Sequence, residues 1–454
     1  MTTRRDFIKK AGAGSALLAV GGALPGFSAS SYQRIIGAND RVNVAMIGVN
    51  DRGNQVAAAY ARQTTICEIV SICDVDKRAI AKCSENVKKF QTRTPKGEKD
   101  IRKMLEDKEV DAVSIHMPDH WHAPAALLAL QAGKHVYVEK PVCYCPREGE
   151  MLIEATAKYG KVLQVGTQSR SSRLKKEVIQ QLHDGVIGKI HFAKSWYVNR
   201  RNTIGIGKVA AVPDWLDWEL WQGPAPRTVY KDNIVHYNWH WFWHWGTAET
   251  GNNGPHTVDI MCWALNVKYP TKVSSIGSRY YFKDDWETPD TQIVNIEFGN
   301  DVSMLWEGYS CSGKNIDGVS SGSVFHGDKG SLFLPHSGTY YQIFDKRTVI
   351  KDSRGDTSGD QQERVNLTTG AVVPETSGDV LHTANFIEAI QKGTPLAAPI
   401  EGGHKATLLM HLANISQRTG RILNINPANG HILNDGEAQG YWSRSYEPGW
   451  EPKV

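Results

Sequence analysis

A chain of 454 residues is long enough to bury two hydrophobic cores, and its 41% hydrophobic and 22% charged residues are the proportions of an ordinary globular protein. This composition excludes a disordered, fibrous or collagen-like chain. The formal net charge of +4 is concentrated near the N-terminus, so the remaining chain is nearly neutral. Nothing in the charge balance therefore points to nucleic acid as a partner.

The cysteines are scattered and form no Cys-x-x-Cys pair. Seven is an odd number, and with this spacing it indicates core thiols rather than a disulfide framework or a zinc site. We therefore expect free, buried cysteines and no resident metal.

Residues 1–30 have the pattern of an export signal. The paired Arg4 and Arg5 precede a glycine-rich, weakly hydrophobic run over 11–24, which is typical of a twin-arginine signal. That run is too short for a stable membrane span. We therefore expect an exported, periplasmic protein in which residues 31–40 are a linker; a disordered basic tail is the alternative.

The folded part begins with a strand, a glycine turn and a helix. The apolar run 42–47 predicts a buried strand, and the turn Gly48-Val49-Asn50-Asp51-Arg52-Gly53 leads into a helix over 54–62. A second strand over 67–73 ends at Asp74. This order of elements is typical of a dinucleotide-binding unit, in which the helix start faces a pyrophosphate.

Asp74 favours NAD, because its carboxylate suits ribose hydroxyls and repels a 2′-phosphate. Asn50 stands where dinucleotide-binding turns usually have their middle glycine, so one alternative is a glycine turn that binds no nucleotide. Lys77 and Arg78 follow Asp74 and could hold a 2′-phosphate, so NADP is a second alternative.

Two further strands are expected over 110–116 and 135–138, with a helix over 123–132 between them. Pro118 and Pro141 end these strands at the same sheet edge, where open α/β sheets bind ligands. Lys140 therefore becomes a candidate for chemistry.

The segment from Asp119 to His122 is expected to be a loop over the same edge, near a nicotinamide. His120 and His122 have the spacing of metal ligands, but no third ligand follows nearby, so positioning of cofactor or substrate is the favoured interpretation. A helix over 146–159 and a strand over 161–165 complete a first domain of residues 41–166.

The glycine turn, Asp74, the Pro118-to-His122 segment and Glu139-Lys140-Pro141 together resemble the Gfo/Idh/MocA family of nicotinamide-dependent sugar oxidoreductases. The resemblance spans nearly the whole chain after the signal. It implies a Rossmann domain, a second α/β domain that carries the substrate site, and a homo-oligomer, dimer or tetramer. The cofactor-binding residues predicted on this basis are Gly48, Asn50, Asp51, Arg52, Gly53, Asp74, Pro118, His120, His122, Glu139, Lys140 and Gln168.

Residues 167–454 are expected to form the second α/β domain, built on a large, mostly antiparallel open sheet. Alternating or aromatic-rich segments at 189–199, 272–283, 291–299, 302–309 and 340–350 are its predicted strands. Helices are expected over 380–391 and 404–419, and the resemblance implies that they pack back onto the first domain.

Tryptophan is concentrated between these elements. Trp239, Trp241, Trp243 and Trp245 alternate, so on an extended segment their indoles would share one side. Such faces suit stacking on sugar rings, and an aromatic core seam or subunit interface is the equally favoured alternative.

Gly254, His256 and Asp259 match the Gly-x-His-x-x-Asp segment of the family, on the first turns of an expected helix. The family usually has an aspartate four residues before the histidine, where this chain has Asn252. The resemblance therefore places the main catalytic roles on His256 and Lys140.

Oxidation of a carbinol carbon needs a base for the hydroxyl proton and a positive group for the developing alkoxide. We assign Lys140 as the cation, His256 as the proton acceptor and Asn252 as a holder of a neighbouring hydroxyl. Predicted substrate contacts are Lys140, Trp121, Trp243, Trp245, Asn252, His256 and Asp259.

The expected function is hydride transfer between a sugar or glycoside carbon and a tightly retained nicotinamide, because free cofactor is lacking outside the cytoplasm. A redox-neutral NAD-dependent glycosidase is one alternative, although the glycosidases of this superfamily replace the lysine that is Lys140 here. A non-catalytic carbohydrate-binding protein is the other.

Overall fold

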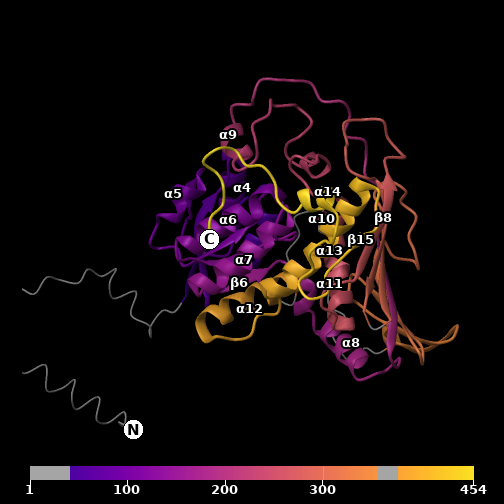
Figure 1. Ribbon diagram of the computed structural model, residues 1–454. Coiled ribbons are helices and arrows are strands. Elements are labelled where there is room, and N and C mark those ends of the chain that lie inside the picture. The colour runs from indigo at the N-terminus through magenta and orange to yellow at the C-terminus, as the bar shows by residue number, and fades with distance from the viewer. Residues whose placement is uncertain (1–40, 300, 356–376) are drawn as a thin grey trace, which may run out of the picture. The chain divides into compact units, whose positions relative to one another are not determined.

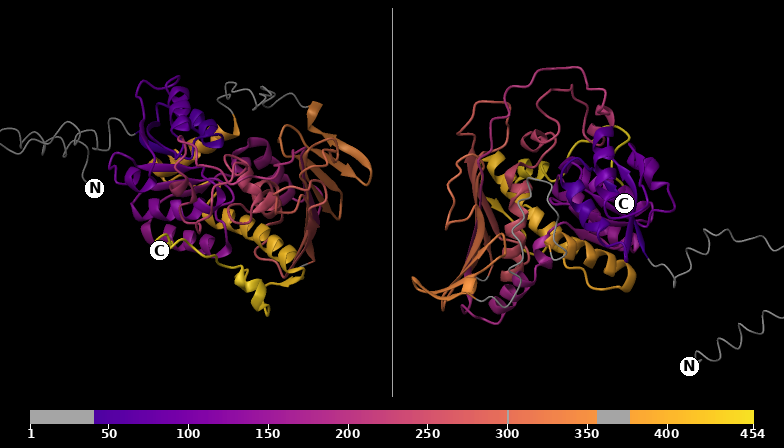
Figure 2. Two further views of the ribbon diagram at one scale, coloured as in Figure 1. Left: turned by 90° about the horizontal axis from the view of Figure 1, so that it is seen from above. Right: turned by 180° about the vertical axis from the view of Figure 1, so that it is seen from behind.

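Two β-sheets organise the protein, and the computed structural model describes residues 41–299, 301–355 and 377–454 of it. The expected signal and linker, residues 1–40, lie outside this part. The first sheet belongs to the indigo and purple half of Figure 1, and the second sheet stands edge-on in orange. The yellow helix α13 (Ile400–Thr419) lies between the two sheets in all three views of Figures 1 and 2.

The first sheet is parallel, with strand order β3-β2-β1-β4-β5-β6. Its strands are β1 (Val42–Ile47), β2 (Cys67–Cys73), β3 (Lys96–Glu98), β4 (Ala112–Ile115), β5 (His135–Val138) and β6 (Leu163–Val165). The helices between them are α3 (Arg52–Ala61), α4 (Lys77–Val87), α5 (Ile101–Leu105), α6 (Asp119–Gln131) and α7 (Pro146–Tyr159). This is the Rossmann order, and it confirms the predicted class of the first domain.

Helix α6 begins four residues earlier than expected, so the prediction of a loop at Asp119 to His122 is wrong. Pro124 lies inside the helix and cannot donate a hydrogen bond to the carbonyl of His120. Arg444 replaces that donor, because its Nη2 donates to the His120 oxygen at 2.6 Å. A residue more than three hundred positions away thus allows the helix to start at Asp119.

The second sheet has nine strands in the order β14-β13-β12-β11-β7-β10-β9-β8-β15. They are β7 (Ile190–Val198), β8 (Lys272–Ser278), β9 (Thr291–Phe298), β10 (Val302–Tyr309), β11 (Ser321–Gly327), β12 (Ser331–Pro335), β13 (Gln342–Asp345), β14 (Thr348–Asp352) and β15 (Leu423–Asn424). Only the β10–β7 pair is parallel among these neighbours, so the prediction of a mostly antiparallel sheet is confirmed.

Helices cover one face of this sheet, as Figure 1 shows for α8, α11 and α13. The alternating burial along β9 and β10 follows from that one-sided cover. At the junction with the first domain, α12 contacts α3 and α13 contacts α7. The bounds of the helices in the second half are α8 (Arg173–His183), α9 (Trp218–Gln222), α10 (Ala248–Asn252), α11 (Gly254–Leu265), α12 (Gly378–Lys392) and α14 (Gly436–Gly440), with short 3₁₀ turns η1 (Gln168–Ser171), η2 (Asn238–Trp241) and η3 (Ser353–Gly355).

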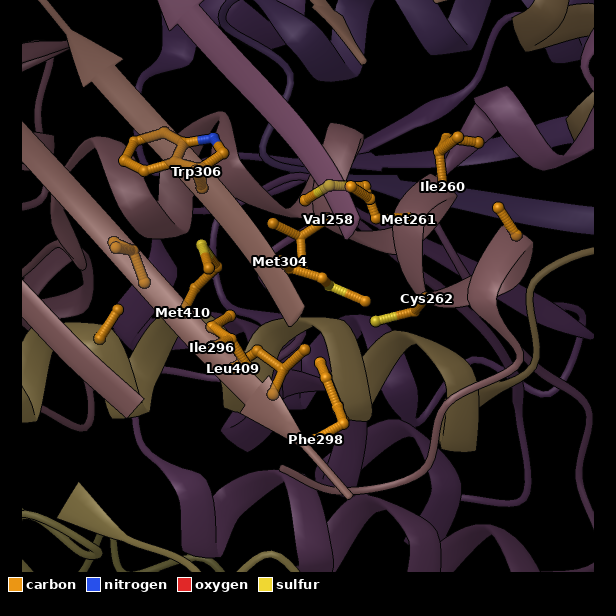
Figure 3. Packing of buried hydrophobic residues seen from close by; sticks show 14 of the residues in the cluster. Val258, Ile260, Met261, Cys262, Ile296, Phe298, Met304, Trp306, Leu409 and Met410 are labelled. Carbon is orange, nitrogen blue, oxygen red and sulfur yellow. The ribbon is translucent and has the colours of Figure 1, made fainter. Parts of the chain in front are cut away.

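The core between sheet and helices is tightly filled around Trp306 of β10 (Figure 3). Its side chain is fully buried, and a Cβ added at Gly308 would lie 2.3 Å from the indole. No hydrogen-bond partner for the indole N–H is present in the described part of the chain. The site therefore depends on packing rather than on polar contacts.

We expect Trp306→Ala to lower the free energy of unfolding by about 3–5 kcal/mol, because the deleted indole leaves a cavity that such a filled core cannot close. Urea unfolding followed by circular dichroism measures the loss. Trp306→Phe, which keeps an aromatic ring and removes the unpaired N–H, leaves a smaller cavity and should cost less than Trp306→Ala. Equal losses for both variants would contradict this account.

The tryptophan-rich segment is not extended, so the prediction of four indoles on one side is wrong. Residues 238–241 form the turn η2, which rotates successive side chains apart. Trp239 and Trp245 belong to one buried cluster, whereas Trp241 stacks on Trp286 at a centroid distance of 4.0 Å. The alternative of an aromatic core seam accounts for these three indoles.

The last residues of the chain return to the first domain. Trp450 packs edge-on against Trp121, with ring centroids 5.2 Å apart, and Arg444 forms an ion pair with the buried Glu148 of α7. In Figure 1 the C-terminus accordingly lies over the purple helices.

All seven cysteines fall within the described residues and are free and buried, as predicted. No helix in the described ranges is both long and apolar enough to cross a bilayer.

Candidate active site

A cavity of about 1320 Å³ runs along the carboxyl ends of the first sheet and continues beneath residues 336–339, which follow β12. That volume exceeds the range of about 300–1,000 Å³ usual for one drug-sized ligand, so a dinucleotide and a second molecule can share it. Of the predicted site residues, the cavity is lined by Gly48, Asn50, Asp51, Arg52, Asp74, Pro118, Trp121, His122, Glu139, Lys140, Gln168, Asn252 and His256.

The glycine turn forms a cradle that larger residues would fill. Gly48 has φ +76°, and a Cβ there would lie 2.8 Å from the backbone of His116. A Cβ on Gly53 would lie 2.0 Å from the Gly48 oxygen. The start of α3 can therefore approach the end of β1 closely, and Asn50, Asp51 and Arg52 at this start line the cavity, where a helix N-terminus suits a pyrophosphate.

Asp74 ends β2 at the rim of this cradle. Its carboxylate accepts hydrogen bonds from the backbone N–H groups of Val49, at 2.7 Å, and Asp76, at 2.9 Å. Burial raises the pKa of Asp74 to about 6, against the opposing effect of these two bonds. The carboxylate is thus held in place and remains charged at neutral pH, as an acceptor for ribose hydroxyls should be.

Arg78, a residue that could hold the 2′-phosphate of NADP, already binds other side chains. Its guanidinium binds Asp76 through Nε and Nη2 at 3.0 and 2.8 Å and stacks on Trp215, 3.6 Å from the ring centroid. Two of the guanidinium nitrogens are therefore already used by Asp76, which agrees with NAD.

Arg52 and Glu139 form the centre of an ion-pair network at the sheet edge. Arg52 Nε lies 2.9 Å from Glu139, and its terminal nitrogens bind Asp379 of α12 at 2.6 and 2.9 Å. Burial would raise the pKa of Glu139, but the charge of Arg52 holds it at about 2. Gln168 adds a bond to Glu139 at 3.0 Å, so these predicted cofactor residues fix the edge to α12.

Lys140 follows β5 and reaches across to α10. Its Nζ donates to the backbone oxygen of Asn252 at 2.5 Å and lies 3.3 Å from the Asn252 side-chain oxygen. Burial lowers the pKa of Lys140, while Glu139 and Asp119 oppose that effect. Asn252 therefore orients the ammonium group, a role that sequence reasoning did not assign to it.

His256 lies on the first turn of α11 and completes the pair with Lys140. Burial, followed by the charge of Lys140, lowers the pKa of His256 well below its ordinary value. The imidazole is therefore neutral at neutral pH and able to accept a proton. Its ring contacts the ring of His336 at a centroid distance of 5.3 Å.

Glu249 is an acid that lies behind the site and does not line the cavity. It is buried beside Asn252, accepts a bond from Ser310 at 3.0 Å, and pairs with Arg201 Nε at 2.7 Å. Its charge is thus balanced by Arg201, a partner 48 positions away that no local pattern reveals.

Five predicted site residues lie outside the cavity lining: Gly53, His120, Trp243, Trp245 and Asp259. Asp259 instead forms a two-bond ion pair with Arg170, at 2.7 and 2.8 Å. His120 packs between Trp221 and Trp245, and its Nε2 contacts the Trp221 oxygen at 3.1 Å. These side chains support the walls rather than face the cavity.

His122 was predicted and lines the cavity, where its Nδ1–H donates to the Pro141 oxygen at 2.6 Å. Other lining residues carried no sequence signal. Lys175, His236, Tyr237 and His336 were missed, because none of them belongs to a recognisable motif. No cluster of three His, Cys, Asp or Glu residues suited to a metal occurs in the described ranges.

The cavity offers a dinucleotide cradle at one end and a lysine beside a neutral histidine further along, which defines the class of NAD-binding oxidoreductases. The chain belongs to one such family, Gfo/Idh/MocA, as the resemblance predicted. Residues 42–167 match its NAD-binding Rossmann domain and residues 179–425 its C-terminal α/β domain.

Curated relatives include a glycosyl hydrolase family 109 protein of Saccharopolyspora erythraea, 27% identical over 47% of this chain and 49% of its own length. An α-N-acetylgalactosaminidase of Shewanella oneidensis is 25% identical over 43% of this chain and 46% of its own length. The chain thus spans about half the length of the curated relatives that it matches.

Solved structures with the same fold include a levoglucosan dehydrogenase bound to NADH and levoglucosan, with a TM-score of 0.64 and 17% identity over 85% of this chain and 99% of the other. The WlbA dehydrogenase of Bordetella pertussis, bound to NADH and UDP-GlcNAcA, has a TM-score of 0.63 and 16% identity over the same shares. At such identity the likeness shows the fold alone.

Proposed function

We propose that the protein transfers a hydride between a hydroxyl-bearing carbon of a sugar or glycoside and NAD. The observation that carries this proposal is the juxtaposition of Lys140, Asn252 and a neutral His256 in the cavity that holds Asp74 and the glycine cradle. Bound NAD would supply the hydride acceptor, with its ribose on Asp74 and its pyrophosphate at the start of α3.

The protein residues would handle the proton and the developing charge. Lys140 donates a hydrogen bond to the substrate hydroxyl and stabilises negative charge on its oxygen. His256 takes the hydroxyl proton as the carbon gives up its hydride, so the carbinol becomes a carbonyl. Asn252, bonded to Lys140, holds the ammonium group in line for this step.

Titration of the purified protein with sugars and methyl glycosides tests this function. We expect an absorbance rise near the reduced-nicotinamide band with at least one compound, and release of bound NAD on denaturation. A preparation that holds or accepts NAD but gives no reduction with any compound would contradict the dehydrogenase function.

A redox-neutral glycoside-cleaving function is the second candidate, because the curated relatives are family 109 glycosidases. Nitrophenyl glycosides distinguish the two. Nitrophenol release without net NADH formation would favour cleavage, whereas reduction without release favours the dehydrogenase. The presence of Lys140 leads us to expect the latter.

We also propose export to the periplasm by the twin-arginine route, with NAD retained, and a homo-oligomer. The paired Arg4 and Arg5 support export by this route. Because the twin-arginine route carries folded proteins with loaded cofactors, the protein can leave the cytoplasm with NAD already bound. The helix-free face of the second sheet, which exposes Ile276, supports an oligomer. Fractionation of cells and light scattering of the purified protein test these two points.

A further inference from the structure

Lys175 is a buried cation that the mechanism does not use. It lies in the first turn of α8, is 4% exposed, and lines the cavity. Its Nζ donates to the Ser169 hydroxyl and to the His336 backbone oxygen, both at 2.7 Å. An ammonium group has three donors, so one is left for a ligand.

In the described part of the chain, no carboxylate balances the charge of Lys175. Within the residues that the structure describes, no acid lies within ion-pair distance of Lys175. Burial alone lowers the pKa of Lys175 to about 8, so the side chain is still mainly charged at neutral pH. A buried, unbalanced cation is costly unless something compensates it.

The acids that line the cavity are engaged elsewhere. Glu139 and Asp379 bind Arg52, and Asp119 accepts two bonds from Thr247. Glu177, on the same helix as Lys175, is exposed and bonded to Gln181. None of these four acids forms an ion pair with Lys175.

The surroundings of Lys175 are also built to hold it. Gly338 has φ +62°, and a Cβ there would lie 2.8 Å from the Lys175 stem, so only glycine fits the turn that packs on it. His336, on the same turn, touches the ring of His256. Burial, followed by the charges of Lys175 and Lys140, lowers the pKa of His336 to about 3, so it is a neutral donor or acceptor.

We propose that Lys175 and His336 form a subsite for a carboxylate group of the substrate, so that the preferred substrates are acidic sugars such as uronic acids and their glycosides. This rests on the proposed sugar oxidoreductase function. Because His336 touches His256, the carboxylate and the reacting hydroxyl belong to the same sugar unit. A single ammonium charge matches a carboxylate better than a phosphate ester, which carries about −1.5 to −2.

Binding to the NADH-loaded protein, which cannot accept a hydride from the sugar, tests the subsite without turnover and is measured by tryptophan fluorescence and calorimetry. The probes are methyl glycosides of glucose, galactose and mannose, each paired with the corresponding methyl glycosiduronate. We expect at least one uronate to bind about 10- to 100-fold more tightly than its neutral partner, the range of one charge-assisted hydrogen bond.

In Lys175→Met that preference should vanish, while affinity for the neutral sugar changes less than about threefold. Lys176→Met, which removes the neighbouring exposed lysine, is the matched control and should keep the preference. Lys175→Gln retains donors for Ser169 and His336 but lacks the charge, so it should fold and also lose the preference.

Equal binding of acid and neutral partners in all pairs would overturn the subsite, and so would tighter binding of the matching sugar 6-phosphates. A preference that survives in both Lys175→Met and Lys175→Gln would also overturn it. Uronate binding that depends on Lys175 but produces no reduced nicotinamide would support the subsite and contradict the proposed dehydrogenase function.

Discussion

Replacing Lys140 with methionine is expected to leave NAD bound and to reduce kcat for sugar oxidation by about 10²–10³-fold. The methionine fills similar space but cannot donate to the substrate oxygen, and loss of a preorganised charged donor costs about 10²–10³-fold in well-studied active sites. The loss of the hydrogen bond to Asn252 also frees that residue. Stopped-flow absorbance of the reduced nicotinamide measures the effect.

The control for this variant is Lys176→Met, an exposed lysine on α8 whose loss should leave kcat unchanged. Affinity for NAD, measured by calorimetry, should differ less than about threefold between Lys140→Met and the parent protein. Sugar oxidation at the parent rate in Lys140→Met would refute the assignment of Lys140. Loss of NAD binding would instead assign Lys140 to the cofactor cradle.

Replacing Asp74 with asparagine is expected to weaken NAD binding by about 100-fold, because two ribose hydroxyls lose a charged acceptor. The same residue should make binding pH-dependent. Only the carboxylate can accept both hydroxyls, and burial raises its pKa to about 6 in the NAD-free protein. Affinity should therefore be constant above about pH 7 and fall about tenfold for each pH unit below 6.

Calorimetric titrations with NAD between pH 5 and 8 check both parts of this expectation. The Asp74→Asn variant should bind weakly with little pH dependence over that range. Asp184→Asn, an exposed acid on the far side of α8, is the matched control and should behave as the parent protein. Parallel pH curves for Asp74→Asn and the parent would show that another group titrates.

The first domain was predictable from the sequence because its signals are local. The strand Cys67–Cys73 and the helix Pro146–Tyr159 have the bounds that apolar runs and a first-turn proline predict. The glycine turn and Asp74 likewise mark a cradle without any long-range information. The strand that ends before Pro141 marked Lys140 as a candidate, and the family resemblance added His256. The fold brings both residues to one cavity.

The remaining features depend on partners far along the chain. Arg201 neutralises Glu249, and Arg444 takes over the donor that Pro124 lacks. Lys175 stands beside Lys176 in a polar helix and looks exposed in the sequence, yet the turn at Gly338 covers it. The prediction of an extended segment at the alternating tryptophans was wrong for the same reason. Their alternation fits a strand, but tertiary packing stabilises a turn there.

The contact of Arg444 with α6 fixes an order of events during synthesis. The ribosome makes the Rossmann domain first, and such domains usually fold as they emerge. Here the His120 carbonyl opposite Pro124 gains its donor only when residue 444 has been made. The hydrogen bonding of α6 is therefore completed only after residue 444 has left the ribosome and reached the first domain.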